Sequence, residues 1–381
     1  MKIAVLREHA SHEQRVAISP DAVKKYLQLG FDVAIESGAG TLSGFSDAMY
    51  EEAGATLSET ADDALNAASI ILCVNAPSDE LVDLMPVGAQ LVGMLAPHEH
   101  KALLQRCAAR QVDAFALELL PRISRAQSMD VLSSQSNLAG YRAVIDAVAE
   151  SSKATPMMMT AAGTVPPAKA LILGAGVAGL QAIATAKRLG AVVSAFDVRP
   201  AVREQVQSLG ATFIEVPAEE SGEAAGGYAK EMSEDYQRKQ SELIAETLKK
   251  QDIVITTALI PGKKAPVLIT QAMVEAMKTG AVIVDLAVAS GGNCPLSQPN
   301  KTVDHHGVLI IGYTNMPARV AADASALYAR NLYHFVSTLM VKDKALATQW
   351  DDELVSGTLL TREGAIVHPA FLNAAQGDTH G

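Results

Sequence analysis

The sequence predicts an α/β chain of two doubly wound domains with parallel sheets, the first of them discontinuous because the chain returns to it at the end. Short apolar segments alternate with helical patterns through most of the 381 residues, which is typical of parallel sheets. Apolar residues make up 49% of the chain and aromatic residues only 4%, so small aliphatic side chains must fill the cores. Such side chains suit sheets that are covered by helices on both faces.

The first domain is expected at 1–132, and its alternation starts at the amino terminus. Ser19 is a predicted N-cap and Pro20 a first helical residue, which favours a helix at Asp21–Leu29 that ends before a glycine. Apolar runs predict strands in this domain at Lys2–Leu6, Phe31–Ile35, Ile70–Val74, Gln90–Met94 and Val112–Ala116.

The second domain is expected at 133–322, and apolar residues at helical spacing predict that it opens with a helix from about Ser133 to Ala149. Residues 154–168 contain three prolines and no charge, so we interpret them as a connection between domains rather than an element. A second alternating series follows. It predicts strands at Ala170–Leu173, Val192–Phe196, Asp252–Thr256, Ala281–Asp285 and Val308–Ile311, and helices at Val177–Leu189 and Gln271–Lys278.

The chain is expected to return to the first domain at 323–381, through a long helical pattern over Ala318–Leu339. The tail, Arg362–Gly381, is expected to be an extension or a disordered end. Residues 217–236 contain six acidic residues against one lysine and show no clear periodicity. This segment is either a solvated surface loop or a mobile lid.

Composition excludes several classes of function. A net charge of −11 argues against a nucleic-acid partner, because phosphate contacts need clustered lysine and arginine. The three cysteines are far apart and give neither a disulfide framework nor a metal-ligand pattern, so no metal is predicted. The amino terminus lacks the apolar core of a signal peptide. The uncharged run 170–186 approaches the length of a membrane span, but its glycine spacing favours a soluble chain.

The strongest local signal is the sequence GAGVAG at 174–179, because a predicted strand precedes it and a predicted helix follows. In this pattern Gly174 permits a tight turn, Gly176 lets the backbone approach a pyrophosphate, and Gly179 lets the helix pack on the strand. The amides at the helix N-terminus would then bind the diphosphate of a dinucleotide. This Rossmann-like turn gives the candidate cofactor contacts Gly174, Ala175, Gly176, Val177, Ala178 and Gly179.

An acidic residue, Asp197, ends the next predicted strand, roughly 20 residues downstream as the fingerprint requires. Its carboxylate would accept hydrogen bonds from ribose hydroxyls and repel a 2′-phosphate, which favours NAD over NADP. Arg199 complicates this prediction, since a nearby arginine can accommodate such a phosphate. The simpler alternative is that Asp197 only ends a strand.

Polar residues precede the helix predicted near Ser133. Arg122, Arg125, Gln127 and Asp130 form either a turn and capping segment or a set of partners for a carboxamide ring, and the residues alone leave both interpretations open. Nine histidines are present, but none lies in this segment or in the glycine turn. His98, His100 and the pair His305–His306 are interpreted as solvated loop positions.

The stretch PRISRAQSMD at 121–130, with SSQSNLAGYRA after it, resembles the NAD(H)-binding component of proton-translocating nicotinamide nucleotide transhydrogenases, which are related to alanine dehydrogenases. The resemblance extends over almost the whole chain. Further matching blocks are EQRVAISP at 13–20, TAAGTVPPAK at 160–169, GAGVAGLQAIATAKRLGA at 174–191, GGYAKEM at 226–232, TTALIPGKKAPVLIT at 256–270 and IVDLAVASGGNCP at 283–295.

The resemblance implies roles for individual residues. Gln127 would place the nicotinamide ring, Asp130 and Ser133 would bind its carboxamide, and Arg122 belongs to the same motif. Tyr228 would close over bound nucleotide from a mobile loop, which strengthens the lid interpretation. Further cofactor contacts are expected at Ala258 and Leu259.

The same resemblance implies partners. The chain would act as a separate soluble subunit and a homodimer, and would exchange hydride directly between NADH and NADP⁺ bound on a partner subunit. Membrane-spanning partner subunits would hold it at the cytoplasmic face of the membrane and couple the transfer to proton translocation.

Two other functions remain open. An alanine dehydrogenase would use a lysine and a histidine on the first domain, but Asn75 and Ala96 stand at the matching positions, and neither takes up a proton. Arg15 is retained, and His98 leaves room for a shifted alignment. A module that senses NAD without catalysis would use the same nucleotide site.

Overall fold

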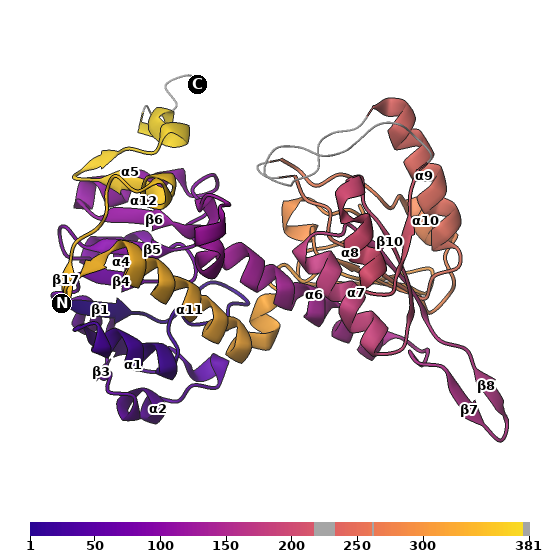
Figure 1. The fold of residues 1–381 in the computed structure, drawn as a ribbon, viewed down its shortest axis with the longest axis horizontal. Coiled ribbons are helices and arrows are strands. Elements are labelled where there is room, and N and C mark those ends of the chain that lie inside the picture. Colours follow the sequence, from indigo (N-terminus) through magenta and orange to yellow (C-terminus); the bar gives the residue numbers. More distant parts are fainter. Residues whose placement is uncertain (217–232, 261–262, 376–381) are drawn as a thin grey trace. The chain divides into compact units, whose positions relative to one another are not determined.

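A computed structural model describes residues 1–216, 233–260 and 263–375 of the chain (Figure 1). The chain forms two compact units. Unit 1 comprises Met1–Gln135 and Ala318–Gly381, and unit 2 comprises Ser136–Pro317. The chain passes from unit 1 to unit 2 inside helix α6 (Val131–Glu150) rather than at the proline-rich residues 154–168.

The central sheet of unit 1 has the order β19-β18-β6-β5-β4-β1-β2-β3. Its first six strands along the chain are parallel, and the five strands expected from apolar runs are present within about two residues. The strands are β1 (Lys2–Val5), β2 (Asp32–Glu36), β3 (Thr56–Ser58), β4 (Ile70–Leu72), β5 (Gln90–Gly93), β6 (Asp113–Ala116), β18 (Leu359–Arg362) and β19 (Ala365–Ile366).

Helices pack against this sheet. Helix α1 begins where expected, because the Ser19 hydroxyl accepts a hydrogen bond from the Ala22 amide and Pro20 takes the first helical position. The helices of unit 1 are α1 (Pro20–Gln28), α2 (Asp47–Glu52), α3 (Ala61–Leu65), α4 (Asp79–Leu84), α5 (Lys101–Arg110), α11 (Ala321–Leu339) and α12 (Glu353–Thr358). A short hairpin, β16 (Val341–Lys342) and β17 (Ala345–Leu346), follows α11.

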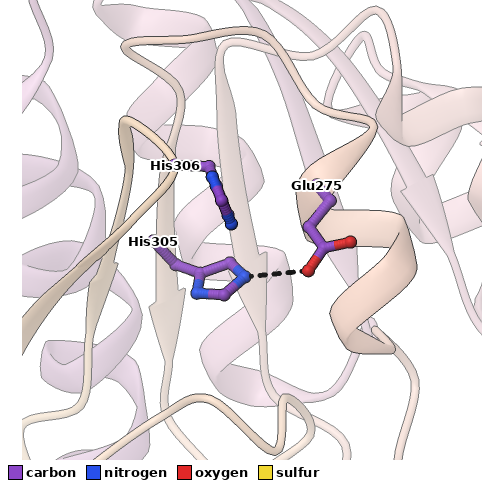
Figure 2. A group of neighbouring side chains, drawn as sticks. All are labelled: Glu275, His305 and His306. Atoms are coloured by element: carbon purple, nitrogen blue, oxygen red, sulfur yellow. Dashed lines mark hydrogen bonds and ion pairs between the residues drawn. The ribbon is translucent and has the colours of Figure 1, made fainter.

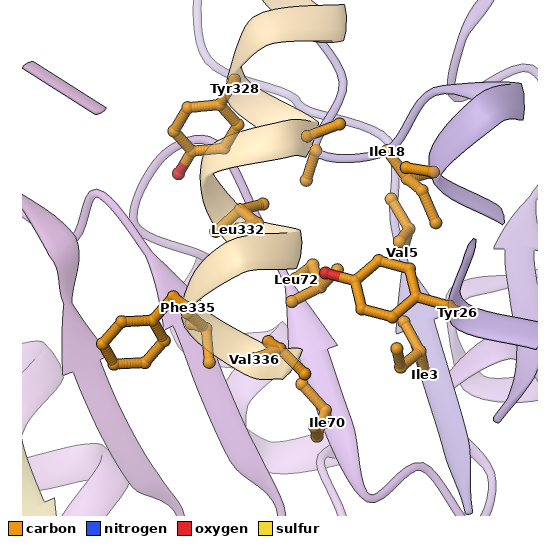
Figure 3. Close-up of a cluster of buried hydrophobic side chains, with 14 of the residues drawn as sticks. Ile3, Val5, Ile18, Tyr26, Ile70, Leu72, Tyr328, Leu332, Phe335 and Val336 are labelled. Atoms are coloured by element: carbon orange, nitrogen blue, oxygen red, sulfur yellow. The ribbon is translucent and has the colours of Figure 1, made fainter. Parts of the chain in front are cut away.

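The core of unit 1 explains why the carboxyl-terminal segment belongs to it. Tyr328, Leu332, Phe335 and Val336 lie on one face of α11 and pack over the side chains of β1 and β4 (Figure 3). All four are fully buried. Removing that many apolar side chains from water stabilises the unit by roughly 1.5–3 kcal/mol for each side chain.

The tail prediction is wrong for most of its length. Arg362 ends β18, which pairs antiparallel with β6, and the chain continues through β19 to a 3-10 helix at Pro369–Ala375. Phe371 in that helix is 4% exposed and lies in the core beneath α5. The strands escaped prediction because their pairing partners are far away in the sequence.

The sheet of unit 2 has the order β11-β10-β9-β12-β13-β15-β14, and only its edge strand β14 runs antiparallel. The strands are β9 (Lys169–Leu173), β10 (Val192–Phe196), β11 (Thr212–Ile214), β12 (Ile253–Thr256), β13 (Val282–Asp285), β14 (Thr302–His305) and β15 (Val308–Ile311). Both sheets therefore share the doubly wound order 3-2-1-4-5-6, in which connections change direction between the first and fourth strands.

The helices of unit 2 differ from the predictions in two places. They are α7 (Val177–Arg188), α8 (Arg203–Ser208), α9 (Glu234–Leu248) and α10 (Gln271–Glu275). Helix α10 is shorter than expected. The loop predicted at 217–236 ends earlier, because Ser233 caps α9 through its hydroxyl; residues 217–232, including Tyr228, lie outside the described residues.

Residues 154–168 are not a plain connection. They contain an antiparallel hairpin, β7 (Met158–Thr160) and β8 (Gly163–Val165), which projects from unit 2 (Figure 1). Its Met159 side chain is 81% exposed. None of the helices among the described residues combines the length and hydrophobicity needed to cross a membrane.

Candidate functional site

The carboxyl ends of three neighbouring strands in unit 2 hold most of the predicted cofactor residues. Gly174 follows β9, Asp197 follows β10, and Ala258 follows the adjacent strand β12. The sheet changes its winding direction between β9 and β12, and ligands of doubly wound sheets bind in the crevice at that point.

The glycine turn has the backbone geometry that its sequence predicts. Gly174 has a φ of +99°, which side-chain-bearing residues rarely adopt. A Cβ atom on Gly179 would overlap the carbonyl oxygen of Gly174, and one on Gly140 of α6 would overlap the carbonyl oxygen of Ala178. These two glycines therefore allow α7 to approach both the turn and α6.

Gly176 serves a different purpose. It is the N-cap of the 12-residue helix α7, makes no side-chain cap, and leaves the first-turn amides of Val177 and Ala178 at the helix end. A Cβ atom there would meet only the guanidinium of Arg199, at 4.0 Å. An open backbone in front of a helix N-terminus fits the pyrophosphate of a dinucleotide.

Asp197 and Arg199 form one hydrogen-bonded unit. The buried Asp197 carboxylate accepts from the Ala175 amide at 2.7 Å, the Arg199 amide at 2.9 Å, and the Arg199 guanidinium at 2.9 and 2.8 Å. Its four acceptor positions are thus occupied. Asp197 therefore fixes the glycine turn, and Arg199 partly neutralises the charge expected to repel a 2′-phosphate.

The loop after β12 is held by a residue that sequence reasoning missed. The fully buried Asn293 donates to the carbonyls of Ala258 and Pro266, and accepts from the Ala258 amide at 3.0 Å. Leu259 is 46% exposed beside this clamp. The one available signal was an asparagine between glycine and cysteine in the 283–295 block.

A second buried residue, Asp285, orders the neighbouring segment. It ends β13 and accepts hydrogen bonds from two hydroxyls and two amides, including the Ser297 hydroxyl at 2.7 Å. Sequence reasoning gave it no role because an aspartate at a strand end is common.

In unit 1, the polar segment at 122–133 forms a 3-10 helix, Ser124–Met129, whose Ala126 and Met129 side chains are buried. Asp130 then caps α6: one carboxylate oxygen accepts the Ser133 amide at 2.9 Å and the other accepts the Ser133 hydroxyl at 2.5 Å. The capping interpretation is therefore correct for these two residues, which leaves a ligand-binding role as a separate question.

The remaining members of the segment point in different directions. The Arg125 guanidinium pairs with Asp352 and Glu353, so it serves the fold of unit 1. The side chains of Arg122 and Gln127 are exposed. Exposure leaves both accessible to a ligand.

Unit 1 has its own switch point, between β1 and β4, and acidic side chains fill it. Glu8 follows β1, and its carboxylate accepts the Val74 amide at 2.6 Å and both nitrogens of Asn75 at 3.1–3.2 Å. Glu8 and Asn75 also line a cavity of about 680 Å³. A carboxylate bound to these amides excludes the phosphate that the equivalent crevice of unit 2 can accept.

Arg15 is committed to neighbours within unit 1. Its guanidinium donates to both oxygens of Glu13, at 2.8 and 2.7 Å, and to Gln135 at 2.9 Å. Burial would raise the pKa of Glu13, but the bonds and charge of Arg15 outweigh it and lower the pKa to about 2. Asn75 donates to Glu13 as well. Arg15 is therefore a poor anchor for a substrate carboxylate.

His98 offers little support for amino-acid chemistry. Its ring lies edge-on to Phe371, with ring centroids 4.8 Å apart, and Ala96 has a φ of +43°. Asn75, Ala96 and the committed Arg15 together leave the described residues of this crevice without a base matched to an amine.

Comparisons with known proteins agree with this geometry. The family model for the N-terminal domain of alanine dehydrogenase/PNT matches residues 4–139, and the model for the C-terminal domain matches residues 143–369. The chain is 57% identical to an NAD(P) transhydrogenase subunit alpha chain of Rhodospirillum rubrum, over 97% of this chain and 99% of that protein.

Two solved structures extend the comparison. The transhydrogenase from Sinorhizobium meliloti is 49% identical and superposes with a TM-score of 0.85, covering 97% of this chain and all of that one. An L-alanine dehydrogenase is 28% identical, with a TM-score of 0.81 and 99% of each chain covered. The chain therefore belongs to the alanine dehydrogenase/PNT family of dinucleotide-binding oxidoreductases.

Proposed function

We propose that this chain binds NAD(H) on unit 2 and exchanges hydride reversibly between it and NADP⁺ held on a partner subunit. The observation that carries the proposal is the contrast between the two switch points. Unit 2 presents a glycine turn with an open backbone, whereas carboxylates and amides fill the crevice of unit 1. The names of the transhydrogenase relatives support the same conclusion.

Direct transfer between two nicotinamides moves a hydride and changes no protonation state at oxygen or nitrogen. The protein then needs to orient the rings and exclude water rather than supply an acid or base. Neither the glycine turn nor residues 122–133 contains a histidine, which is consistent with that requirement.

Within unit 2, the amides of Val177 and Ala178 would bind the pyrophosphate, and Asp197 would accept the ribose hydroxyls. Because four hydrogen bonds occupy the Asp197 carboxylate, Arg199 must release at least one of them when ribose binds. Ala258 and Leu259 would contact the same nucleotide from the loop after β12.

We assign the nicotinamide end to the motif at 122–133. Gln127 and Arg122 are exposed and accessible, and Asp130 and Ser133 would exchange their mutual hydrogen bond for bonds to the carboxamide. Tyr228 would close over the nucleotide from the segment outside the described residues.

The assembly also belongs to the proposal. The chain would form a homodimer and associate with NADP(H)-binding and membrane-spanning subunits at the cytoplasmic face of the membrane. Those membrane subunits would couple the transfer to proton movement.

Mixing experiments test the proposed reaction. The chain is incubated with NADH and an NADP⁺ analogue, with and without an NADP(H)-binding transhydrogenase subunit. Reduction of the analogue only when the partner is present supports hydride relay. Reduction of NAD⁺ by L-alanine without a partner would instead identify an alanine dehydrogenase, and tight NADH binding without any transfer would identify a sensing module.

A further inference from the structure

A cluster of three potential metal ligands lies on unit 2, away from the nucleotide residues. Glu275 of α10 and His305 and His306 of the β14–β15 hairpin bring their ligand atoms within 4.8 Å of one another (Figure 2). His305 ends strand β14 and its side chain is only 20% exposed, so the expectation of a solvated loop position is wrong for it.

The hairpin presents the two imidazoles from a rigid turn. His306 and Gly307 connect the strands with φ values of +55° and +79°, the signature of a two-residue type I′ turn. The Gly307 amide donates to Asp304 at 2.9 Å, and the Gly307 carbonyl accepts the Gly280 amide at 2.7 Å. The turn is therefore tied to the segment that follows α10.

Glu275 is oriented as well. One of its carboxylate oxygens accepts the Gln271 side-chain amide at 2.8 Å, one helical turn earlier, and lies 3.2 Å from Nε2 of His305. That last distance is close to the ligand–ligand separation of about 3.3 Å that follows from zinc–ligand bonds of about 2.0–2.1 Å in a tetrahedral site.

We propose that Glu275, His305 and His306 bind a divalent transition-metal ion of the zinc class, with water completing a tetrahedral site. Two imidazoles and a carboxylate form a ligand set suited to zinc, whereas magnesium and calcium prefer oxygen ligands alone. Gln271 acts from outside the ligand set, by holding the Glu275 carboxylate in place.

The site is structural rather than catalytic. The turn precedes β15, which runs parallel to β13, so the cluster lies at the amino ends of the parallel strands. The glycine turn follows the carboxyl end of β9, at the opposite edge of the sheet. Bound metal would fasten the edge strand β14 to α10, and NADH affinity should not change.

Isothermal titration of the chelator-treated chain with zinc chloride tests the site. Two variants remove a ligand with little change of shape: Glu275→Gln, and His306→Asn, since asparagine followed by glycine favours the same type I′ turn. His100→Asn is the matched control, because it removes an exposed histidine from unit 1.

The wild-type chain and His100→Asn should bind one zinc ion and gain thermal stability with it. Glu275→Gln and His306→Asn should bind at least ~10-fold more weakly, since even loss of an outer partner typically costs that much, and Gln271→Ala should lose about 10-fold. Melting without metal checks that each variant is folded. Equal zinc affinity in wild type and His306→Asn, or no zinc binding by the wild type, would overturn the proposal.

Discussion

At the scale of single residues, Asp197 illustrates how one carboxylate can serve both fold and specificity. It holds the glycine turn through the Ala175 amide and pairs with Arg199. A replacement must therefore keep its shape if the effect on nucleotide choice is to be separated from an effect on folding.

Asp197→Asn should weaken NADH binding by about 10- to 100-fold and reduce the preference for NADH over NADPH, because hydrogen bonds to a charged group contribute roughly 1.5–3 kcal/mol. Fluorescence titration with both nucleotides measures the two affinities. Arg199→Gln is the control and should keep the preference, since the carboxylate remains. An unchanged preference in Asp197→Asn would mean that this residue only ends a strand.

Gln127 is exposed on the 3-10 helix of unit 1, so its replacement should not disturb the core. Gln127→Asn should slow hydride transfer by about 10²-fold, the usual effect of a small misplacement of reacting groups, with nearly unchanged NADH affinity. Single-turnover kinetics with the partner subunit and equilibrium titration without it separate the two quantities. Equal losses in both would contradict a role in placing the ring.

Glu8 predicts an unusual pH dependence. Burial raises its pKa from 4.5 to about 7, against hydrogen bonds from Val74 and Asn75. A carboxyl whose pKa rises on folding binds its proton more tightly in the folded chain. Its contribution to stability is therefore complete below pH 4.5 and is lost as the pH rises through 7.

Glu8→Gln should remove this dependence, because glutamine resembles the protonated acid. From pH 4.5 to 8, the wild type should lose up to about 3 kcal/mol of unfolding free energy relative to Glu8→Gln, at roughly 1.4 kcal/mol per pKa unit and less where water reaches the cavity. Urea unfolding of both proteins at several pH values measures the difference. A difference that stays constant with pH would refute the assignment.

At the scale of elements, the turn between β9 and α7 separates packing from binding. Gly179 lies against the Gly174 carbonyl, whereas Gly176 has an ordinary φ of −76° and open space around its missing Cβ. The same substitution at the two positions should therefore have different consequences.

Gly176→Ala should leave the melting temperature nearly unchanged and weaken NADH binding at least ~10-fold, because the added methyl group occupies the path of the pyrophosphate. Gly179→Ala should also lower the melting temperature, since a Cβ cannot be placed without moving α7. Calorimetry and NADH titration of both variants make the comparison. Full NADH affinity in Gly176→Ala would place the pyrophosphate elsewhere.

At the scale of the whole molecule, the projecting β7–β8 hairpin is the feature that an isolated chain does not explain. Met157, Met158 and Met159 are 60%, 42% and 81% exposed. Apolar side chains gathered on one exposed element are typical of an interaction surface. We connect this surface with the proposed homodimer.

Met159→Glu should therefore shift the chain from dimer to monomer in sedimentation-velocity experiments, because a dimer would bury the introduced charge. Met49→Glu, at a 41% exposed position on α2, is the control and should leave the dimer intact. A wild-type chain that sediments as a monomer would contradict the proposal.

The sequence by itself determined the alternation of strands and helices, the glycine turn and the acidic residue after β10. These features depend on local periodicity and on short motifs, whose geometry is set within a few residues. The family blocks extended the prediction to nearly the whole chain.

Only the tertiary structure decided which of these residues bond to one another. The strand order brings Glu8 to Val74 and Asn75, Asn293 to Ala258, and His305 to Glu275. Strand pairing and register join positions far apart in the sequence, and local periodicity does not encode them. For the same reason the sequence suggested a loose tail and a solvated histidine, where long-range packing makes an edge strand and a potential metal ligand.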